Sequence, residues 1–210
     1  MSPCEHRCTP RSHEAEQGGD SPKAGRGPLG RLVGGWLDGA RRVPSMNFDA
    51  RPGGELPSLI VVHAISLPPD EFGGTGVEQL FTNTLNPGDH PYYATIHHLR
   101  VSAHFFIRRG GELVQFVSVD ERAWHAGVSN WGGRERCNDF SVGIELEGCD
   151  TLPFEPEQYL RLVEVVEILR ASYPIRAVVG HSDIAPGRKT DPGPCFDWAR
   201  LAPSQLVANR

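Results

Sequence analysis

The stretch that decides how this chain is organised is residues 180–196, which read GHSDIAPGRKTDPGPCF. A short apolar run leads into it, and it carries His181, Lys189 and Asp191. Six of its seventeen residues are proline or glycine, so we expect a stiff loop in which only the start can be a strand and no part can be a helix. Polar side chains on a stiff loop beside a buried strand commonly form a functional site. The alternative is an exposed loop whose charges face water, and this stretch alone does not decide between the two.

Composition limits the class of protein. The chain has 210 residues, of which 39% are hydrophobic, so it can form one domain with a sizeable core. A net charge of −5 gives no electrostatic basis for binding nucleic acid or an anionic membrane. The chain has no apolar run of the roughly 20 residues that span a bilayer and no apolar signal segment at its N-terminus. Its five scattered cysteines do not form the pattern of a disulfide framework. We therefore expect a cytoplasmic protein that contacts neither nucleic acid nor membrane, and we expect a monomer.

The first 30 residues differ from the rest. Residues 1–30 hold nine glycines and prolines and almost no large apolar side chains, which predicts a disordered tail before a folded domain over 31–210. The tail contains four side chains that could ligate a metal, but their spacing matches no common zinc module. These four are Cys4, His6, Cys8 and His13.

The centre of the fold is predicted by residues 58–63, which read SLIVVH. Four consecutive large apolar residues indicate a strand that is buried on both faces, as in α/β proteins. His63 stands at the carboxyl end of this strand, where open α/β sheets bind ligands. The alternative is an isolated histidine that is hydrogen-bonded in the core.

Four further elements follow from local patterns. Residues 76–85 have apolar side chains spaced for one face of a short helix. Segments 101–107 and 113–119 flank Arg-Arg-Gly-Gly-Glu and predict a β-hairpin. Residues 157–172 are the clearest helix, with Pro156 suited to the first turn. The predicted buried face of this helix comprises Leu160, Val163, Val166 and Leu169.

Residues 141–147 alternate as a strand does, with Val142 beginning the apolar side and with Glu145 and Glu147 on the other. Gly143 leaves space above the side with the two carboxylates. The pattern fits either a solvated sheet edge or one wall of a site.

The side chains of His63, His181 and Asp191 form a candidate metal site. Two neutral imidazoles and a carboxylate suit zinc, and three protein ligands leave a fourth position open for water. The chain has no HExxH motif, which excludes a helix-borne site of that type. Spacing alone does not single out this set, because other histidines compete with it. The competitors are His90, His97, His98, His104 and His125.

A zinc hydrolase also needs a base and a group that stabilises the oxyanion. Glu145 or Glu147 could be the base, and Lys189 could be the stabilising cation. Cys195 is an alternative, as a nucleophile, but no helix N-terminus precedes it to lower the pKa of its thiol.

Five segments together resemble the zinc-dependent N-acetylmuramoyl-L-alanine amidases of type 2, and within them the cytoplasmic members that act on 1,6-anhydro-muropeptides. The resemblance covers about residues 36–201 and excludes the tail. The segments are LIVVHAISLPP (59–69), HLRVSAHFFIRRGGELVQFV (98–117), RAWHAGVS (122–129), GRERCNDFSVGIELEG (133–148) and GHSDIAPGRKTDPGPCFDWAR (180–200).

The resemblance implies an α/β fold with a central mixed sheet flanked by helices, as in peptidoglycan recognition proteins and T7 lysozyme. It implies one zinc ion per chain, held by His63, His181 and Asp191. It makes Glu145 the general base and Lys189 the group that stabilises the transition state.

The same resemblance suggests that Arg100 and Arg136 bind carboxylates of the stem peptide. The pattern is broken at Ala64, where close relatives have asparagine, which puts contacts to substrate at that position in doubt.

The implied activity is hydrolysis of the amide between the lactyl group of anhydro-muramic acid and L-alanine, in the recycling of cell-wall fragments and so in control of β-lactamase induction. Two alternatives are a recognition module that binds peptidoglycan without cutting it, and a lysin that cuts the intact wall.

Overall fold

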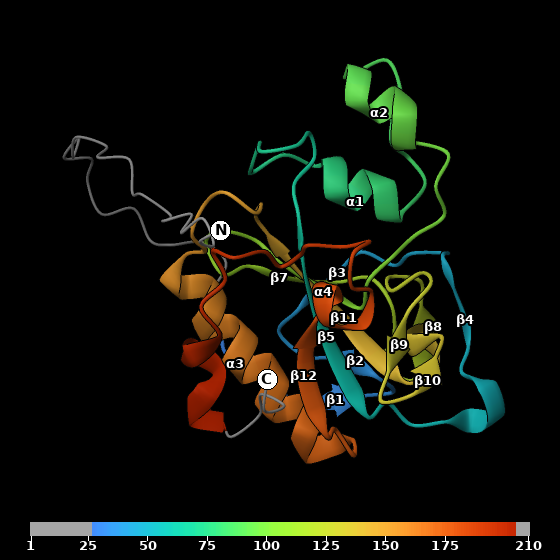
Figure 1. The fold of residues 1–210 in the computed structure, drawn as a ribbon, viewed down its shortest axis with the longest axis vertical. Helices are drawn as coiled ribbons and strands as arrows, with labels where there is room; N and C mark the ends of the chain where they lie inside the picture. The colour runs from blue at the N-terminus through green and yellow to red at the C-terminus, as the bar shows by residue number, and fades with distance from the viewer. Residues whose placement is uncertain (1–26, 205–210) are drawn as a thin grey trace, which may run out of the picture.

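The structure is a computed structural model in which residues 27–204 can be described (Figure 1). Most of the predicted tail, with its four candidate metal ligands, lies outside the described residues. The last residues of that tail contact the domain. The amide of Gly30 donates to the carbonyl of Asp38, and the guanidinium of Arg161 donates to the carbonyl of Gly27.

A six-stranded mixed sheet forms the centre of the molecule, as expected. Its order is β12-β5-β11-β6-β7-β3, in which β12, β5, β11 and β6 are parallel neighbours and β7 is antiparallel to β6. The predicted hairpin is confirmed by β6 and β7, although both strands are shorter than predicted. The bounds are β12 Ala177–Gly180, β5 Leu59–Ile65, β11 Ser141–Glu147, β6 Phe105–Ile107, β7 Leu113–Gln115 and β3 Arg41–Arg42.

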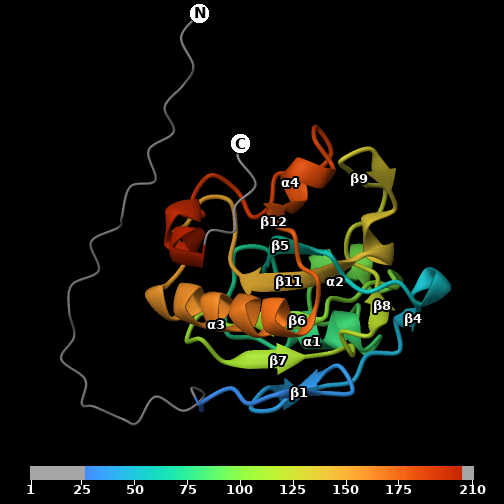
Figure 2. The same ribbon diagram turned by 90° about the horizontal axis from the view of Figure 1, so that it is seen from below.

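Helix α3 (Pro156–Ser172) covers one face of this sheet and packs on residues such as Val62 and Ile144 (Figure 2). The predicted helix is confirmed, but the place given to Leu160 on its buried face is wrong, since this side chain is 51% exposed. The side-chain amide of Gln158 donates to two backbone carbonyls of the sheet and so faces it. Leu160, two residues and about 200° further round the helix, is therefore turned to solvent.

Helices α1 (Gly76–Phe81) and α2 (Pro91–Ile96) lie together beyond the carboxyl end of β5 (Figure 1). The apolar side chains of α1 pack on the opposite face of the sheet, in a cluster that includes Phe106. The sequence predicted α1 but not α2, because six residues are too short to show an apolar period. The available signal for α2 was Pro91, since proline is favoured in the first turn of a helix.

Residues 180–196 begin with a single helical turn, α4 (His181–Ile184), which corrects the expectation that no part of the stretch is helical. The prolines begin at Pro186, so nothing prevents a turn before them. The Asp183 carboxylate accepts a hydrogen bond of 2.7 Å from the amide of Gly180 and stabilises the start of the turn. The rest of the stretch is loop, as expected.

Short pairs and 3-10 turns complete the domain. No helix within 27–204 has the length and apolar character of a membrane span. The strand pairs are β1 Leu32–Val33 with β2 Trp36–Leu37, β4 Phe48–Ala50 with β8 Glu121–Ala123, and β9 Asn130–Trp131 with β10 Arg134–Glu135. The turns are η1 Pro52–Gly54, η2 Cys137–Asp139 and η3 Trp198–Ser204.

The buried side chain of His104 links β11 to β8. Its Nδ1 accepts a hydrogen bond of 3.0 Å from the amide of Gly143, so Nε2 carries the proton and donates to the carbonyl of Glu121 at 3.0 Å. Burial, together with the positive charge of Arg51 nearby, lowers the pKa of His104 to about 3. His104 is therefore neutral in the folded protein.

This burial predicts a loss of stability in acid. The pKa of His104 is about 3 when folded and 6.5 when unfolded, so on acidification the unfolded chain binds the proton first. The stabilisation is complete above pH 6.5 and falls by about 1.4 kcal/mol per pH unit below it. Urea unfolding of the metal-free protein between pH 7 and pH 5 measures this slope. In His104→Asn the change of unfolding free energy with pH should be smaller by about 1.4 kcal/mol per pH unit, which corresponds to one proton. Equal slopes in the variant and the wild type would contradict the assignment.

Candidate metal centre and active site

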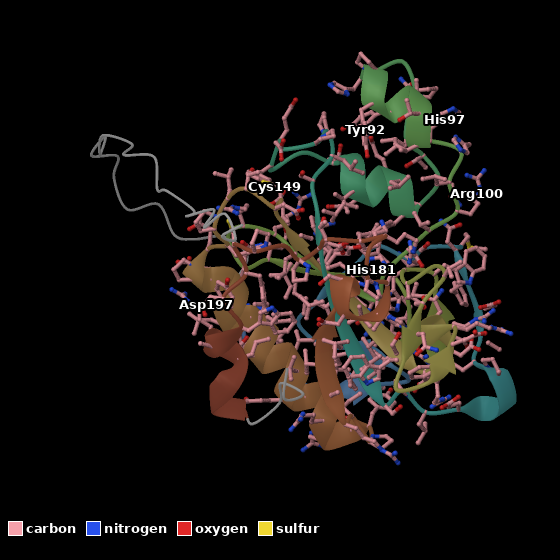
Figure 3. The ribbon with its side chains drawn as sticks, in the orientation of Figure 1. Tyr92, His97, Arg100, Cys149, His181 and Asp197 are labelled. Atoms are coloured by element: carbon pink, nitrogen blue, oxygen red, sulfur yellow. The ribbon has the colours of Figure 1, made fainter. Side chains whose placement is uncertain are left out.

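Three adjacent parallel strands bring the central side chains to one level. His63 on β5 is in register with Glu145 on β11, and paired residues of parallel strands point to the same face. Gly180 ends β12 in register with Val62, so His181, the next residue, stands level with His63. Figure 3 shows His181 at this carboxyl end of the sheet. The strand pairing alone therefore places two histidines and a carboxylate side by side.

Asp191 joins the two histidines from the loop after α4. Nδ1 of His63 lies 2.9 Å from Nδ1 of His181, and these atoms lie 3.1 Å and 3.0 Å from Oδ2 of Asp191. These separations are near the roughly 3.3 Å between donors around a tetrahedral zinc with bonds of about 2.0 Å. Within 27–204 this is the one group of three or more His, Cys, Asp or Glu side chains placed to share a metal ion. The structure thus brings the candidate ligands together.

The hydrogen bonds at this group fit a cation. Nε2 of His181 is 3.1 Å from the carbonyl of Ala126, to which it donates, so its Nδ1 is an acceptor that faces the Asp191 carboxylate. Burial lowers the pKa of His63 to about 4, which keeps this imidazole neutral. Oδ2 of Asp191 lies 3.1 Å from Nδ1 of His63 and 3.0 Å from Nδ1 of His181. Acceptor atoms and a negative charge within about 3 Å of one another attract a metal ion.

Glu145 lies beside this group, and one of its carboxyl oxygens is free of hydrogen bonds within residues 27–204. It is buried, and its Oε2 has no hydrogen-bond partner among the described residues. Burial raises the pKa of Glu145 well above the ordinary value, and the charge of Asp191 adds to this shift. A buried carboxyl oxygen without a partner is costly unless function requires it. These features are typical of a catalytic acid or base.

Glu147, two residues further along β11, is occupied. Its two carboxylate oxygens accept hydrogen bonds from the amides of Gly73 at 2.6 Å and Arg109 at 3.0 Å. It therefore holds two loops against the sheet and is not free to move protons. Strand β11 is buried along its whole length, so the interpretation of its carboxylate face as a solvated edge is wrong.

Lys189 is exposed on the loop between α4 and Asp191. The Asp191 carboxylate contacts His63 and His181, and among the described residues Lys189 forms no ion pair with it. The neighbouring Arg188 anchors the loop, since its guanidinium donates to the carbonyls of Ala126 and Val128 at 2.8 Å and 2.6 Å.

A cavity of about 600 Å³ opens over the group. All five side chains predicted for metal binding and catalysis line it, as does Ala64, the position where the sequence departs from the family pattern. Its far walls come from residues near Leu67, from α2 and from the segment around Cys149. Tyr92 of α2 and Cys149, both labelled in Figure 3, belong to these walls. Cys195 does not line the cavity, which leaves the thiol-nucleophile alternative without support.

The structure does not bring Arg100 and Arg136 into this cavity. Arg100 is exposed near the end of α2, apart from His181 in Figure 3, and donates to two adjacent backbone carbonyls. Arg136 is 68% exposed and pairs with Asp139 at 3.2 Å. Their contact with substrate stays a prediction.

Sequence reasoning missed the residues that support the site. His125 entered only as a competing ligand, whereas Asn138 and Arg188 were not considered. Asn138 Oδ1 accepts hydrogen bonds from the amides of His125 and Ala126 and so fixes the segment that touches both histidine ligands. No local pattern marks such residues, because their partners are distant in sequence.

Known proteins are similar to this chain in sequence and in architecture. The family described as N-acetylmuramoyl-L-alanine amidase matches residues 53–194. The 1,6-anhydro-N-acetylmuramyl-L-alanine amidase AmpD of Escherichia coli is 62% identical over 169 residues, which are 80% of this chain and 92% of the relative. AmpD of Haemophilus influenzae is 50% identical over 81% of this chain and 94% of its own length.

Solved structures agree. A crystal structure of an AmpD derivative has a TM-score of 0.81 and 60% identity, and the match covers 84% of this chain and 99% of that one. The Escherichia coli amidase AmiD, in complex with a substrate that contains anhydro-N-acetylmuramic acid, has a TM-score of 0.52 and 31% identity, with 86% of this chain and 66% of that one covered. The predicted fold class is thereby confirmed. The chain belongs to the N-acetylmuramoyl-L-alanine amidase family, whose members are metal-dependent.

Proposed function

We propose that this protein is a zinc amidase that cleaves the amide between the lactyl group of 1,6-anhydro-N-acetylmuramic acid and the L-alanine of the stem peptide. The observation that carries the proposal is the meeting of His63, His181 and Asp191 beside the unpartnered carboxyl oxygen of Glu145, all in one cavity. The named activity of relatives that this chain matches over 90% or more of their length supports the same substrate.

His63, His181 and Asp191 would hold one zinc ion per chain. Zinc when bound would polarise the amide carbonyl and lower the pKa of the attacking water. The chain contributes two neutral imidazoles and one carboxylate, a donor set typical of catalytic zinc sites.

Glu145 would move the proton. Its Oε2 is free to accept a proton from the attacking water and then to donate it to the nitrogen of the leaving L-alanine. Its raised pKa suits both steps, since a base that must also act as an acid works best with a pKa near the working pH. The ammonium group of Lys189 would stabilise the negative charge that develops on the carbonyl oxygen.

Arg100 and Arg136 lie outside the cavity, so we assign them to the parts of a stem peptide that extend beyond it. Soluble wall fragments in the cytoplasm are the proposed substrate pool, with an indirect effect on β-lactamase induction. A module that only binds peptidoglycan would gain nothing from the buried Oε2 of Glu145, which has no hydrogen-bond partner among the described residues. A lysin that cuts intact wall remains the second candidate, and turnover of anhydro-muropeptide against intact wall separates the two.

Loss of one ligand should remove the metal. Asp191→Ala leaves two imidazoles, and we expect stoichiometric zinc in the wild type and little in the variant. Elemental analysis after dialysis against a weak chelator measures this, together with mass spectrometry of an anhydro-muropeptide substrate. Asp38→Ala, an exposed carboxylate, is the matched control and should keep its zinc. Full activity of wild-type protein in excess chelator would overturn the zinc assignment.

Glu145→Gln should lower kcat by about 10²–10⁴, the usual contribution of a positioned base, while zinc stays bound. Glu147→Gln is the matched control on the same strand face. Because Glu147 accepts two backbone hydrogen bonds, this change should lower the melting temperature. It should leave kcat near the wild-type value. Equal losses of kcat in the two variants would contradict the assignment of Glu145 as base.

Lys189→Met keeps most of the side-chain volume and removes the charge. If the ammonium acts in the transition state, kcat and kcat/KM should both fall by about 10²–10³ with KM little changed. Arg176→Met removes an exposed charge at the opposite end of β12 and is the control. Activity of Lys189→Met within about threefold of wild type would remove Lys189 from the mechanism.

A further inference from the structure

His125 contacts the metal ligand His63 on the side away from the other ligands. Its Nδ1 lies 2.9 Å from Nε2 of His63, and the two rings meet edge to face at 86° with centroids 5.0 Å apart. Nε2 of His125 in turn lies 3.2 Å from the hydroxyl of Ser141. His63, His125 and Ser141 therefore form one chain of hydrogen bonds that leads from the ligand group into the sheet.

This chain determines which nitrogen of His63 carries a proton. A neutral imidazole has one protonated nitrogen and one acceptor. If His125 Nε2 donates to Ser141, its Nδ1 accepts from His63 Nε2, and His63 Nδ1 is left with the lone pair that a metal needs. The hydroxyl of Ser141 can also donate, in which case every proton in the chain shifts and His63 Nδ1 is protonated. A metal ion at Nδ1 selects the first arrangement without movement of either ring.

The fold makes room for the ring of His125 and fixes its backbone. A Cβ atom at Gly143, on the strand below, would lie 2.4 Å from Cγ of His125, so only glycine leaves space for this ring. The amides of His125 and Ala126 donate to Oδ1 of Asn138 at 3.1 Å and 2.8 Å. The carbonyl of Ala126 accepts from His181 Nε2. One anchored segment thus contacts the outer nitrogen of both histidine ligands.

We propose that His125 is a positioning residue, which holds His63 in the tautomer that presents Nδ1 to the metal. The inference rests on the proposed zinc site at His63, His181 and Asp191. Groups that orient a ligating histidine are usually carboxylates or carbonyls, and their loss costs about 10–100-fold in metal affinity. An imidazole differs from those groups because it can also donate, so it satisfies His63 with and without metal.

The test measures zinc affinity by competition with a chromophoric chelator, in wild type, His125→Phe, His125→Asn and Gly143→Ala. His125→Phe keeps the ring and removes the acceptor, and Gly143→Ala displaces the ring, so both should raise the zinc Kd about 10–100-fold. His125→Asn keeps an acceptor near the Nδ1 position and should stay within about threefold of wild type. His98→Phe, an exposed histidine, is the control and should bind zinc as wild type does.

A spectroscopic measurement reads the tautomer directly. In zinc-loaded wild type and in His125→Asn, ¹⁵N shifts of His63 should show a protonated Nε2. Thermal unfolding of the metal-free proteins separates a loss of metal affinity from a loss of fold, and Gly143→Ala provides a second route if His125→Phe does not fold. If the wild type binds zinc and both His125→Phe and Gly143→Ala bind it within threefold of the wild-type affinity, the role of His125 is overturned. A protonated Nδ1 in zinc-loaded His63 would also overturn it. Failure of the wild type itself to bind zinc would overturn the proposed metal site and this inference together.

Discussion

The site depends on the register of three parallel strands. Because β12, β5 and β11 run side by side in one direction, residues at the same level of each strand meet at one edge of the sheet. The pairing of Glu145 with His63 and of Gly180 with Val62 sets three functional side chains in a row before any loop contributes. A slip of one residue in β5 would turn His63 to the face covered by α3. The buried apolar residues that prevent such a slip therefore also protect the ligand geometry.

The chain tolerates unfavourable electrostatics at this edge. A buried carboxyl oxygen of Glu145 has no hydrogen-bond partner in the part of the chain that the structure describes, and the acceptor atoms of His181 and Asp191 face each other at 3.0 Å. Each feature costs stability in a metal-free protein. Two other buried polar side chains are satisfied, since the guanidinium of Arg51 donates to four backbone carbonyls and His104 uses both of its nitrogens. The free Oε2 of Glu145, next to a carboxylate that faces an imidazole acceptor, is what distinguishes this site from Arg51 and His104.

Much of the fold was predictable because its main elements carry strong local signals. The apolar run of β5, the alternation in β11 and the period of α3 predict these three elements. Leu160 was misplaced, because hydrogen bonds to two backbone carbonyls turn Gln158 toward the sheet and Leu160 away from it. Elements of four to six residues, such as α2 and α4, show no period and were missed. The ligand set was one choice among several by spacing alone, and the family resemblance selected it. The supporting contacts of His125 and Asn138 could not be predicted, because they join residues whose proximity only the folded sheet creates.

Glu145 and Glu147 show how position, and not residue type, assigns a role. Both are glutamates on the same face of the same strand, and both are buried. Two backbone amides reach Glu147, from Gly73 and Arg109, and its oxygens are fully engaged. No donor within the described residues reaches Oε2 of Glu145, and burial together with the charge of Asp191 raises its affinity for a proton. The difference arises from what the loops place beside each carboxylate. The loops leave Oε2 of Glu145 without a hydrogen-bond donor, which suits it to proton transfer. They supply two donors to Glu147, which suits it to a structural role.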